Sequence, residues 1–244
     1  MTNTLVQELS GQTVIVLGGS AGIGFETARR ARAAGANVVL TGRNPERLER
    51  AALELQAGRT AAFDATDSAA LQGFFASLRT PVDQIMVTAG APHYGPLLGM
   101  PIEAVKSALS AALSLAVEIA QLAVGRVRAG GSLVFVSGTN RRPRADLGVV
   151  STNAAAFPTL VANLALELAP IRVNLIAAGF VDTDLSAALL GAKLDERRNA
   201  LRSTLPIRRV VKPSDVAALA VHLMANTALT GATYDIDGGQ QLLA

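Results

Sequence analysis

Short apolar segments alternate along the chain with longer segments of helical periodicity. Seven of the short segments have the length and apolar content of buried β-strands. They cover residues 13–17, 37–41, 60–63, 84–88, 132–137, 172–177 and 233–236. Between them, apolar residues recur at helical spacing over residues 22–34, 45–57, 67–79, 101–128, 149–169 and 213–225.

Regular alternation of strand and helix predicts parallel strands, because consecutive parallel strands need a crossover between them. Right-handed crossovers then place helices on both faces of one sheet. We predict an α/β fold with a single doubly wound, Rossmann-type parallel sheet of about seven strands. No linker rich in proline, glycine or serine and no internal repeat divides the sequence, so residues 1–244 are interpreted as one domain.

The loop after the first predicted strand carries a glycine pattern suited to phosphate. It reads GGSAGIG, with Gly18, Gly22 and Gly24 spaced G-x3-G-x-G before a predicted helix. Glycines permit a tight turn and a close approach of the backbone to phosphate, and the helix N-terminus offers free N–H groups. Ser20 and Ile23 lie in the same loop, so we expect them to contact the ligand too.

The second and third predicted strands end near charged residues that suit the adenosine half of a dinucleotide. Arg43 follows the second strand, where an acidic residue would accept a hydrogen bond from a ribose 2′-hydroxyl and a cation suits a 2′-phosphate. We therefore expect NADP(H) rather than NAD, the alternative being that Arg43 is an exposed charge at the start of a helix. Asp64 follows the third strand, and its carboxylate can accept from the adenine amino group.

The composition of the chain bears on metal sites, nucleic-acid partners and membrane segments. The chain has no cysteine, and its two histidines, His93 and His222, are far apart in sequence, so no metal motif is predicted. The formal net charge is only +3, and basic residues are scattered without interleaved aromatic residues, which argues against a nucleic-acid partner. The N-terminal residues do not resemble a signal peptide, and no apolar run looks long and unbroken enough to span a membrane. A cytoplasmic protein is expected.

Four further motifs follow in order along the rest of the chain. They are VTAG at 87–90, GSLVFVSG at 131–138, IRVNLIAAGFVDTDL at 171–185 and YDIDGG at 234–239. Together with the glycine loop, they resemble the short-chain dehydrogenase/reductase family over nearly the whole chain. The resemblance implies further cofactor contacts at Ala89 and Gly90, and at Gly179 and Val181 in the loop that cradles nicotinamide. In that loop, Ala178 replaces the family's usual proline.

The family implies an NAD(P)-dependent oxidoreductase whose active site contains Asn, Ser, Tyr and Lys. The tyrosine exchanges a proton with the substrate oxygen while hydride moves to or from the carbonyl carbon. The lysine, four residues further on, favours the phenolate form of that tyrosine. In this sequence the two positions fall on Val150 and Ala154, which cannot transfer a proton. Neither of the two tyrosines, Tyr94 and Tyr234, has a lysine four residues on.

Other residues near the same sheet edge are candidates for the missing chemistry. Ser137 matches the family's serine if the loop is one residue shorter, and Gly138 takes that position otherwise. His93 and Tyr94 follow the fourth strand, and histidine titrates near neutrality. Asn153 lies one turn into the helix and is able to hydrogen-bond a substrate oxygen. The structural alternatives are an ordinary loop histidine and an ordinary residue of a first helical turn.

The sequence leaves two functions open, one catalytic and one limited to cofactor binding. The first is an NADP(H)-dependent oxidoreductase that acts on a small, largely apolar carbonyl or alcohol substrate through a non-standard active site. The second is a catalytically inactive homologue that binds NADP(H) as a sensor, regulatory or partner subunit. The apolar residues within 184–206, which the family uses as a mobile lid, suggest the apolar substrate. The arginines at positions 141, 142 and 144 are either anion-orienting groups or solvated loop charges.

The helices predicted at 101–128 and 149–169 have longer apolar faces than contact with a sheet requires. The family pairs these helices across a two-fold axis. The resemblance therefore implies a homodimer or a homotetramer.

Overall fold

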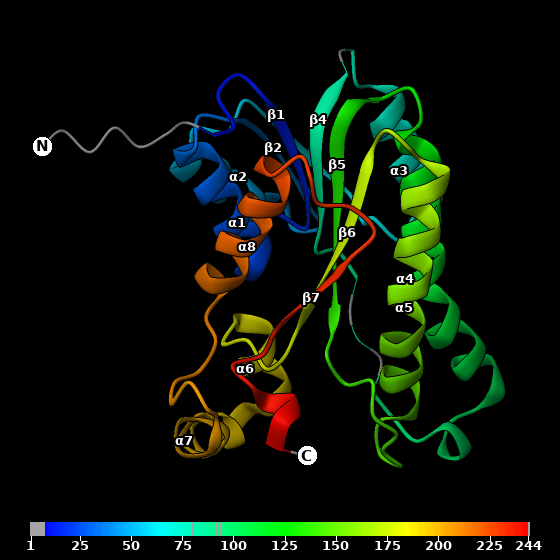
Figure 1. Cartoon of the computed structure of the whole chain (residues 1–244), viewed down its shortest axis with the longest axis vertical. Coiled ribbons are helices and arrows are strands. Elements are labelled where there is room, and N and C mark those ends of the chain that lie inside the picture. Colours follow the sequence, from blue (N-terminus) through cyan, green and yellow to red (C-terminus); the bar gives the residue numbers. More distant parts are fainter. Residues whose placement is uncertain (1–7, 80, 91, 93, 244) are drawn as a thin grey trace, which may run out of the picture.

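Seven parallel strands form one sheet in the order β3-β2-β1-β4-β5-β6-β7 (Figure 1). The computed structural model describes residues 8–79, 81–90, 92 and 94–243. The strands are β1 (Thr13–Leu17), β2 (Asn37–Gly42), β3 (Arg59–Ala62), β4 (Val82–Val87), β5 (Val127–Gly138), β6 (Arg172–Ala178) and β7 (Thr233–Ile236). The predicted doubly wound sheet is confirmed, and its strand order reverses between β1 and β4, where ligands of such sheets bind.

Helices cover both faces of the sheet, as predicted (Figure 1). One face carries α1 (Gly22–Ala33), α2 (Pro45–Leu55) and α8 (Pro213–Ala225), and the other carries α3 (Ser68–Ala76), α4 (Ile102–Ala123) and α5 (Gly148–Glu167). Successive residues of a strand point to opposite faces. Accordingly, Val14 and Val16 belong to one buried apolar cluster, while Ile15 and Leu17 belong to the other.

The boundary between α4 and β5 differs from the prediction. The helix expected over 101–128 ends at Ala123, and β5 begins at Val127 with a pairing to Val82. Gly125 lies between them with a φ of +71°, a left-handed conformation that ends the helix. The apolar pattern continues through this turn because both elements are buried, so periodicity alone could not locate the break.

The connection from β6 to α8 contains helices that were not predicted. They are α6 (Asp184–Leu190), a short 3-10 helix η2 (Gly191–Lys193) and α7 (Leu194–Thr204). Thr183 and Ser186 cap the first of them reciprocally. A serine replaces the usual Glu or Gln of this capping box, so the sequence lacks its ordinary signal. Two more 3-10 helices, η1 (Leu97–Gly99) and η3 (Gln240–Leu243), precede α4 and follow β7.

The helix α5 is apolar enough, over sufficient length, to cross a membrane by composition alone. The expectation that no segment reaches this threshold was therefore wrong, because Glu167 is the only charged residue in the helix. In the structure α5 packs against β6 and α4, and 39% of its most apolar window is buried. The composition of α5 thus fits a helix that covers a sheet and leaves an apolar face outside.

Candidate active site

The loop between β1 and α1 closes tightly on the residue that follows β4. Thr88 Oγ1 donates to the carbonyl oxygens of Leu17 and Gly18 at 3.1 and 3.2 Å. A Cβ at Gly24 would lie 2.2 Å from the Gly18 carbonyl oxygen and 2.6 Å from Thr88 Oγ1. Gly18 itself has a φ of +91°. Side chains are excluded from both glycine positions, as a backbone cradle for phosphate requires.

Thr88 was not predicted as part of this cradle, although it directly precedes the expected contacts Ala89 and Gly90. Its hydroxyl fixes the width of the loop by binding two backbone carbonyls at once. The available signal was its position in the VTAG motif. Gly90 is exposed and has a φ of +102°, so the backbone at the carboxyl end of β4 is open to a ligand.

The N-terminus of α1 is free to receive an anion. Its N-cap residue, Ala21, makes no side-chain capping bond, and no acidic residue occupies the first turn, which includes Ile23. The first N–H groups of a helix carry positive potential and need partners. Ser20, which precedes Ala21, lies against the end of β2, because a Cβ at Gly42 would be 2.9 Å from its Oγ. The glycine loop therefore connects the helix N-terminus with the end of β2.

Arg43 and Asp64 lie at the ends of β2 and β3, as expected. Arg43 Nη1 is 3.9 Å from Asp64 Oδ2, and the two side chains are 75% and 46% exposed. Hydrogen bonds from the Thr66 N–H and hydroxyl, followed by the Arg43 charge, lower the pKa of Asp64. The carboxylate is thus charged at neutral pH. Such a long, exposed contact is weak, so the guanidinium of Arg43 can bind a phosphate.

The loop after β6 approaches the glycine loop from the other side. A Cβ at Gly22 would lie 3.5 Å from Thr183 Cγ2. Gly179 packs on the C-terminal turn, since a Cβ there would be 2.6 Å from that of Asp237. Val181 forms an isolated parallel bridge with Val211. The two loops expected to hold the phosphates and the nicotinamide are therefore adjacent.

The first turns of α5 offer no free acid or base. Val150 is half-buried and Ala154 is buried, at the two positions that the family resemblance assigned to proton transfer. Ser151 Oγ donates to the Leu147 carbonyl at 2.5 Å, and Thr152 Oγ1 donates to the Gly148 carbonyl at 2.8 Å. Both hydroxyls are therefore used within the helix, one turn back.

Asn153 points from α5 towards α4 rather than into an open site. Its Nδ2 donates to the Ala108 carbonyl at 2.9 Å, which fixes the orientation of the amide. Its Oδ1 is buried and has no hydrogen-bond partner among the described residues. In this arrangement Asn153 joins two helices, and its predicted contact with substrate stays a prediction.

The segment after β4 reaches the beginning of α5. A Cβ at Gly148 would lie 2.7 Å from Leu97 Cγ, so η1 packs on the first turn of that helix. Tyr94, just before η1, is 50% exposed, and partial burial raises the pKa of its phenol. His93 lies outside the described residues. Ser137 is half-buried near the end of β5, where it pairs with Ala177 of β6.

Comparison with known proteins assigns the family. A family model described as enoyl-(acyl carrier protein) reductase matches residues 18–241. The chain belongs to the short-chain dehydrogenase/reductase family. It is 31% identical over 251 residues to the 3-oxoacyl-(acyl-carrier-protein) reductase FabG of Chlamydia trachomatis, covering 95% of this chain and 98% of that protein.

Two further relatives place the chain among oxidoreductases. Dehydrogenase/reductase SDR family member 4 of Sus scrofa is 30% identical over 246 residues, covering 95% of this chain and 88% of that protein. The crystal structure of BdcA in complex with NADPH is 27% identical and superposes with a TM-score of 0.82, covering 95% of both chains. The family binds nicotinamide cofactors, and its members here are oxidoreductases.

Two of the loop arginines after β5 have structural partners. Arg141 makes two parallel bonds to Asp235, at 2.9 and 2.6 Å, and a third to Gln241 Oε1 at 3.3 Å. Arg144 pairs with Asp146. The bidentate pair ties the end of β5 to β7, so Arg141 is not available to orient a substrate. Among the described residues, no group of three or more His, Asp or Glu side chains could hold a metal ion.

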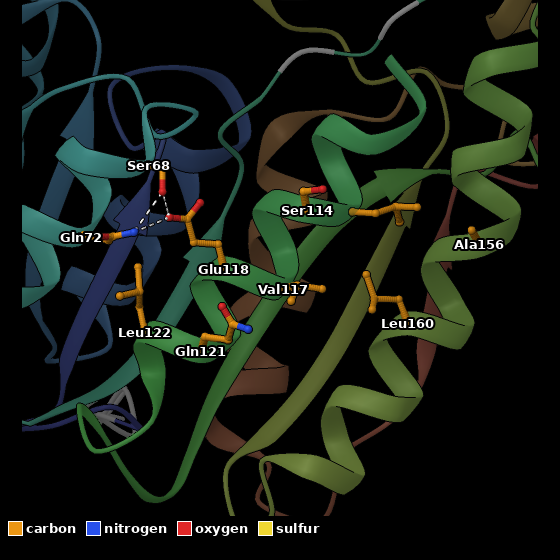
Figure 2. Close-up of a pocket in the computed structure, with 10 residues that line it drawn as sticks. Ser68, Gln72, Ser114, Val117, Glu118, Gln121, Leu122, Ala156 and Leu160 are labelled. Atoms are coloured by element: carbon orange, nitrogen blue, oxygen red, sulfur yellow. Dashed lines mark hydrogen bonds between the residues drawn. The ribbon is translucent and has the colours of Figure 1, made fainter. Parts of the chain in front are cut away.

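A groove of about 700 Å³ lies away from this site, on the outer side of α4 and α5 (Figure 2). Val117 and Leu160 form part of its apolar wall. On the α3 side, Ser68 Oγ and Gln72 Nε2 both donate to Glu118 Oε1. The groove therefore combines the apolar side chains of two helices with the half-buried carboxylate of Glu118.

Proposed function

We propose that this protein is an NADP(H)-dependent oxidoreductase that acts on a small, largely apolar carbonyl or alcohol substrate through a non-standard active site. The observation that carries the proposal is the tight loop of residues 18–24 between β1 and α1, which we call the glycine cradle. No side chain fits at Gly24, and Thr88 holds the loop closed, which supports a phosphate bound by the loop backbone.

The residues of these loops fit a dinucleotide. Gly18, Gly22 and the free N-terminus of α1 would hold the diphosphate. Arg43 would pair with a 2′-phosphate, and Asp64 Oδ2 is left to accept from adenine because its other oxygen binds Thr66. When bound, NADPH supplies the hydride. The weak Arg43–Asp64 contact supports NADP(H) over NAD, since a 2′-phosphate would replace it with a stronger, charge-assisted one.

Reduction of a carbonyl also needs a proton at the substrate oxygen. Tyr234 packs with the apolar cluster on the α1 and α8 face, so Tyr94 is the one phenol of the chain in a loop at the carboxyl edge. The Tyr94 phenol is protonated at neutral pH, although partial burial raises its pKa and makes it a weaker acid than the family's tyrosine, which lies beside a lysine. We assign the proton to the segment containing His93 and Tyr94, with Ser137 as the group that holds the oxygen.

A second function is favoured by the start of α5. Ser151 and Thr152 are bonded to helix carbonyls, and Asn153 is bonded to α4. A catalytically inactive homologue that binds NADP(H) as a sensor, regulatory or partner subunit would show the same cradle with this unreactive helix.

Purified protein separates the two functions. NADPH fluorescence should increase on binding, and NADPH should be oxidised in the presence of members of a broad panel of aldehydes and ketones. Binding without oxidation across the panel would favour the inactive homologue. A double substitution, Val150→Tyr with Ala154→Lys, adds a second test. A gain of carbonyl reduction from an inert parent would show that the missing pair was the defect, whereas loss of a native activity with NADPH binding retained supports a different acid.

We also propose a homodimer or homotetramer that covers the groove of Figure 2. The apolar outer face of α5 supports it, since such a face is normally buried against a partner. Ser114 is exposed and lines the groove, so Ser114→Arg should dissociate the assembly in sedimentation experiments without unfolding the subunit. Leu53→Arg, at an exposed residue of α2, is the control and should leave the assembly intact.

A further inference from the structure

Positive charge is concentrated in the segment between β6 and α8. Residues 184–212 contain seven basic and three acidic residues, a formal charge of +4, while the whole chain carries +3 and the remainder therefore −1. This segment, which we call the lid, holds α6 and α7 and follows the loop that lies beside the glycine cradle. An excess of one sign at a cleft raises the local concentration of ligands of opposite charge.

Ion pairs use part of this charge to anchor the lid. Arg198 binds Asp182 at 2.8 Å and Asp195 at 2.9 Å, which ties α7 to the loop after β6. Arg209 pairs with Asp215 at the start of α8. These pairs hold the lid in place, and their cations are not available to a ligand.

Five exposed basic residues of the lid form no ion pair with a carboxylate in the part of the chain that the structure describes, and two of them, Arg197 and Arg202, belong to α7; the others are Lys193, Arg208 and Lys212. Arg202 donates to the neutral amide oxygen of Asn199, at 2.9 Å. The Arg197 guanidinium carbon lies 5.9 Å from the centroid of the ring of Phe180, which belongs to the loop expected at the nicotinamide. A stacked guanidinium keeps the N–H donors at its edge for a phosphate or a carboxylate.

Apolar side chains are exposed on the same lid. Leu185 and Leu189 of α6 are 51% and 55% exposed. The lid rests on the C-terminal turn, because a Cβ at Gly239 would be 2.6 Å from Pro206 Cγ. Figure 1 shows α6, α7 and the C-terminus gathered at the end of the molecule towards which the strands point. The lid thus offers a ligand leucine side chains from one helix and cations from the next.

We propose that the lid recognises an amphiphilic substrate, with an apolar chain against α6 and an anionic group, phosphate or carboxylate, on Arg197 and Arg202. The inference rests on the proposed function, because it places the substrate under the lid beside the cofactor. It goes further by specifying a negative charge at one end of an otherwise apolar substrate.

Calorimetric titration of NADPH-saturated protein tests this proposal with octyl phosphate, octanoate and octanol. Saturation with NADPH keeps the anions out of the cofactor's own phosphate sites. We expect at least one anion to bind about tenfold tighter than octanol, as one charge-assisted hydrogen bond predicts. That preference should be lost in the Arg197→Gln, Arg202→Gln double variant and should weaken as salt rises. Whichever of octyl phosphate and octanoate binds more tightly identifies phosphate or carboxylate as the preferred group.

Arg50→Gln with Arg79→Gln is the matched control, because it removes the same charge from exposed residues outside the lid. The control should keep the full preference for the anion. Equal binding of octanol and both anions, or a preference that survives in the lid variant, would overturn the inference. Failure of the wild-type protein to bind NADPH would instead refute the proposed function, so the two failures are distinguishable.

Discussion

Gly24→Ala is the substitution for which the structure makes the sharpest prediction. The added methyl would lie 2.2 Å from the Gly18 carbonyl oxygen, so the loop must open by about 1 Å to restore a van der Waals contact. Opening moves the backbone N–H groups that are proposed to bind the diphosphate. Losing one charge-assisted hydrogen bond, worth about 1.5–3 kcal/mol, should weaken NADPH binding by about 10- to 150-fold. Overpacking should also cost about 1–3 kcal/mol of stability.

Gly73→Ala is its matched control. Gly73 also lies within a helix, α3, but nothing lies within 4 Å of its Cβ position. Alanine there should stabilise the protein by about 0.5–1 kcal/mol, raising Tm by about 1–4 °C, because a mid-helix glycine costs backbone entropy. Fluorescence titration with NADPH and thermal melting of both variants make the comparison. Wild-type NADPH affinity in a folded Gly24→Ala variant would refute the assignment of this loop to the cofactor.

Two further substitutions test the site and its support. Tyr94→Phe should lower kcat for carbonyl reduction about 100-fold with unchanged NADPH affinity, while Tyr234→Phe should leave kcat unchanged. Equal kcat values for the two variants would show that Tyr94 is not the proton donor. Arg141→Gln should lower Tm at pH 7 by about 2–4 °C, since it breaks a partly exposed bidentate pair worth about 1 kcal/mol. Burial alone would raise the pKa of Asp235. The hydrogen bonds from Arg141 and Gln241 lower it by more, so the net shift of the Asp235 pKa is downward. The Arg141–Asp235 pair therefore stabilises the fold above about pH 4. The difference in Tm between wild type and Arg141→Gln should shrink as pH falls through the lowered pKa of Asp235. An equal difference in Tm at pH 3 and pH 7 would contradict this.

The sheet could be predicted from sequence because each strand is an apolar run bounded by turn residues. β1 and β7 have the predicted boundaries, and the other strands that were shifted moved by one or two residues, apart from β5. The lid could not be predicted in the same way. Its helix α7 buries only Leu201, so it lacks the apolar stripe from which helices are recognised. Its stability comes from ion pairs such as Arg198–Asp182, which join residues 16 positions apart and leave no local pattern.

The cofactor half of the site was also visible in sequence, since glycines at Gly18 and Gly24 are required wherever backbone segments touch. The catalytic half was not, because the orientation of a polar side chain depends on its neighbours in space. Asn153 illustrates this: the carbonyl that it binds belongs to Ala108, 45 residues earlier in the chain. Its spacing in α5 gave no sign of that partner.

Equilibrium titration of the wild-type protein with NADPH and NADH, followed by nicotinamide fluorescence, determines which of the two cofactors the site prefers. The exposed guanidinium of Arg43, which lies 3.9 Å from Asp64, predicts that NADPH binds at least about tenfold tighter than NADH. Arg43→Asp should reverse that order. Equal affinity for both cofactors would contradict the NADP(H) assignment, and failure to bind either would contradict the account of the glycine cradle itself.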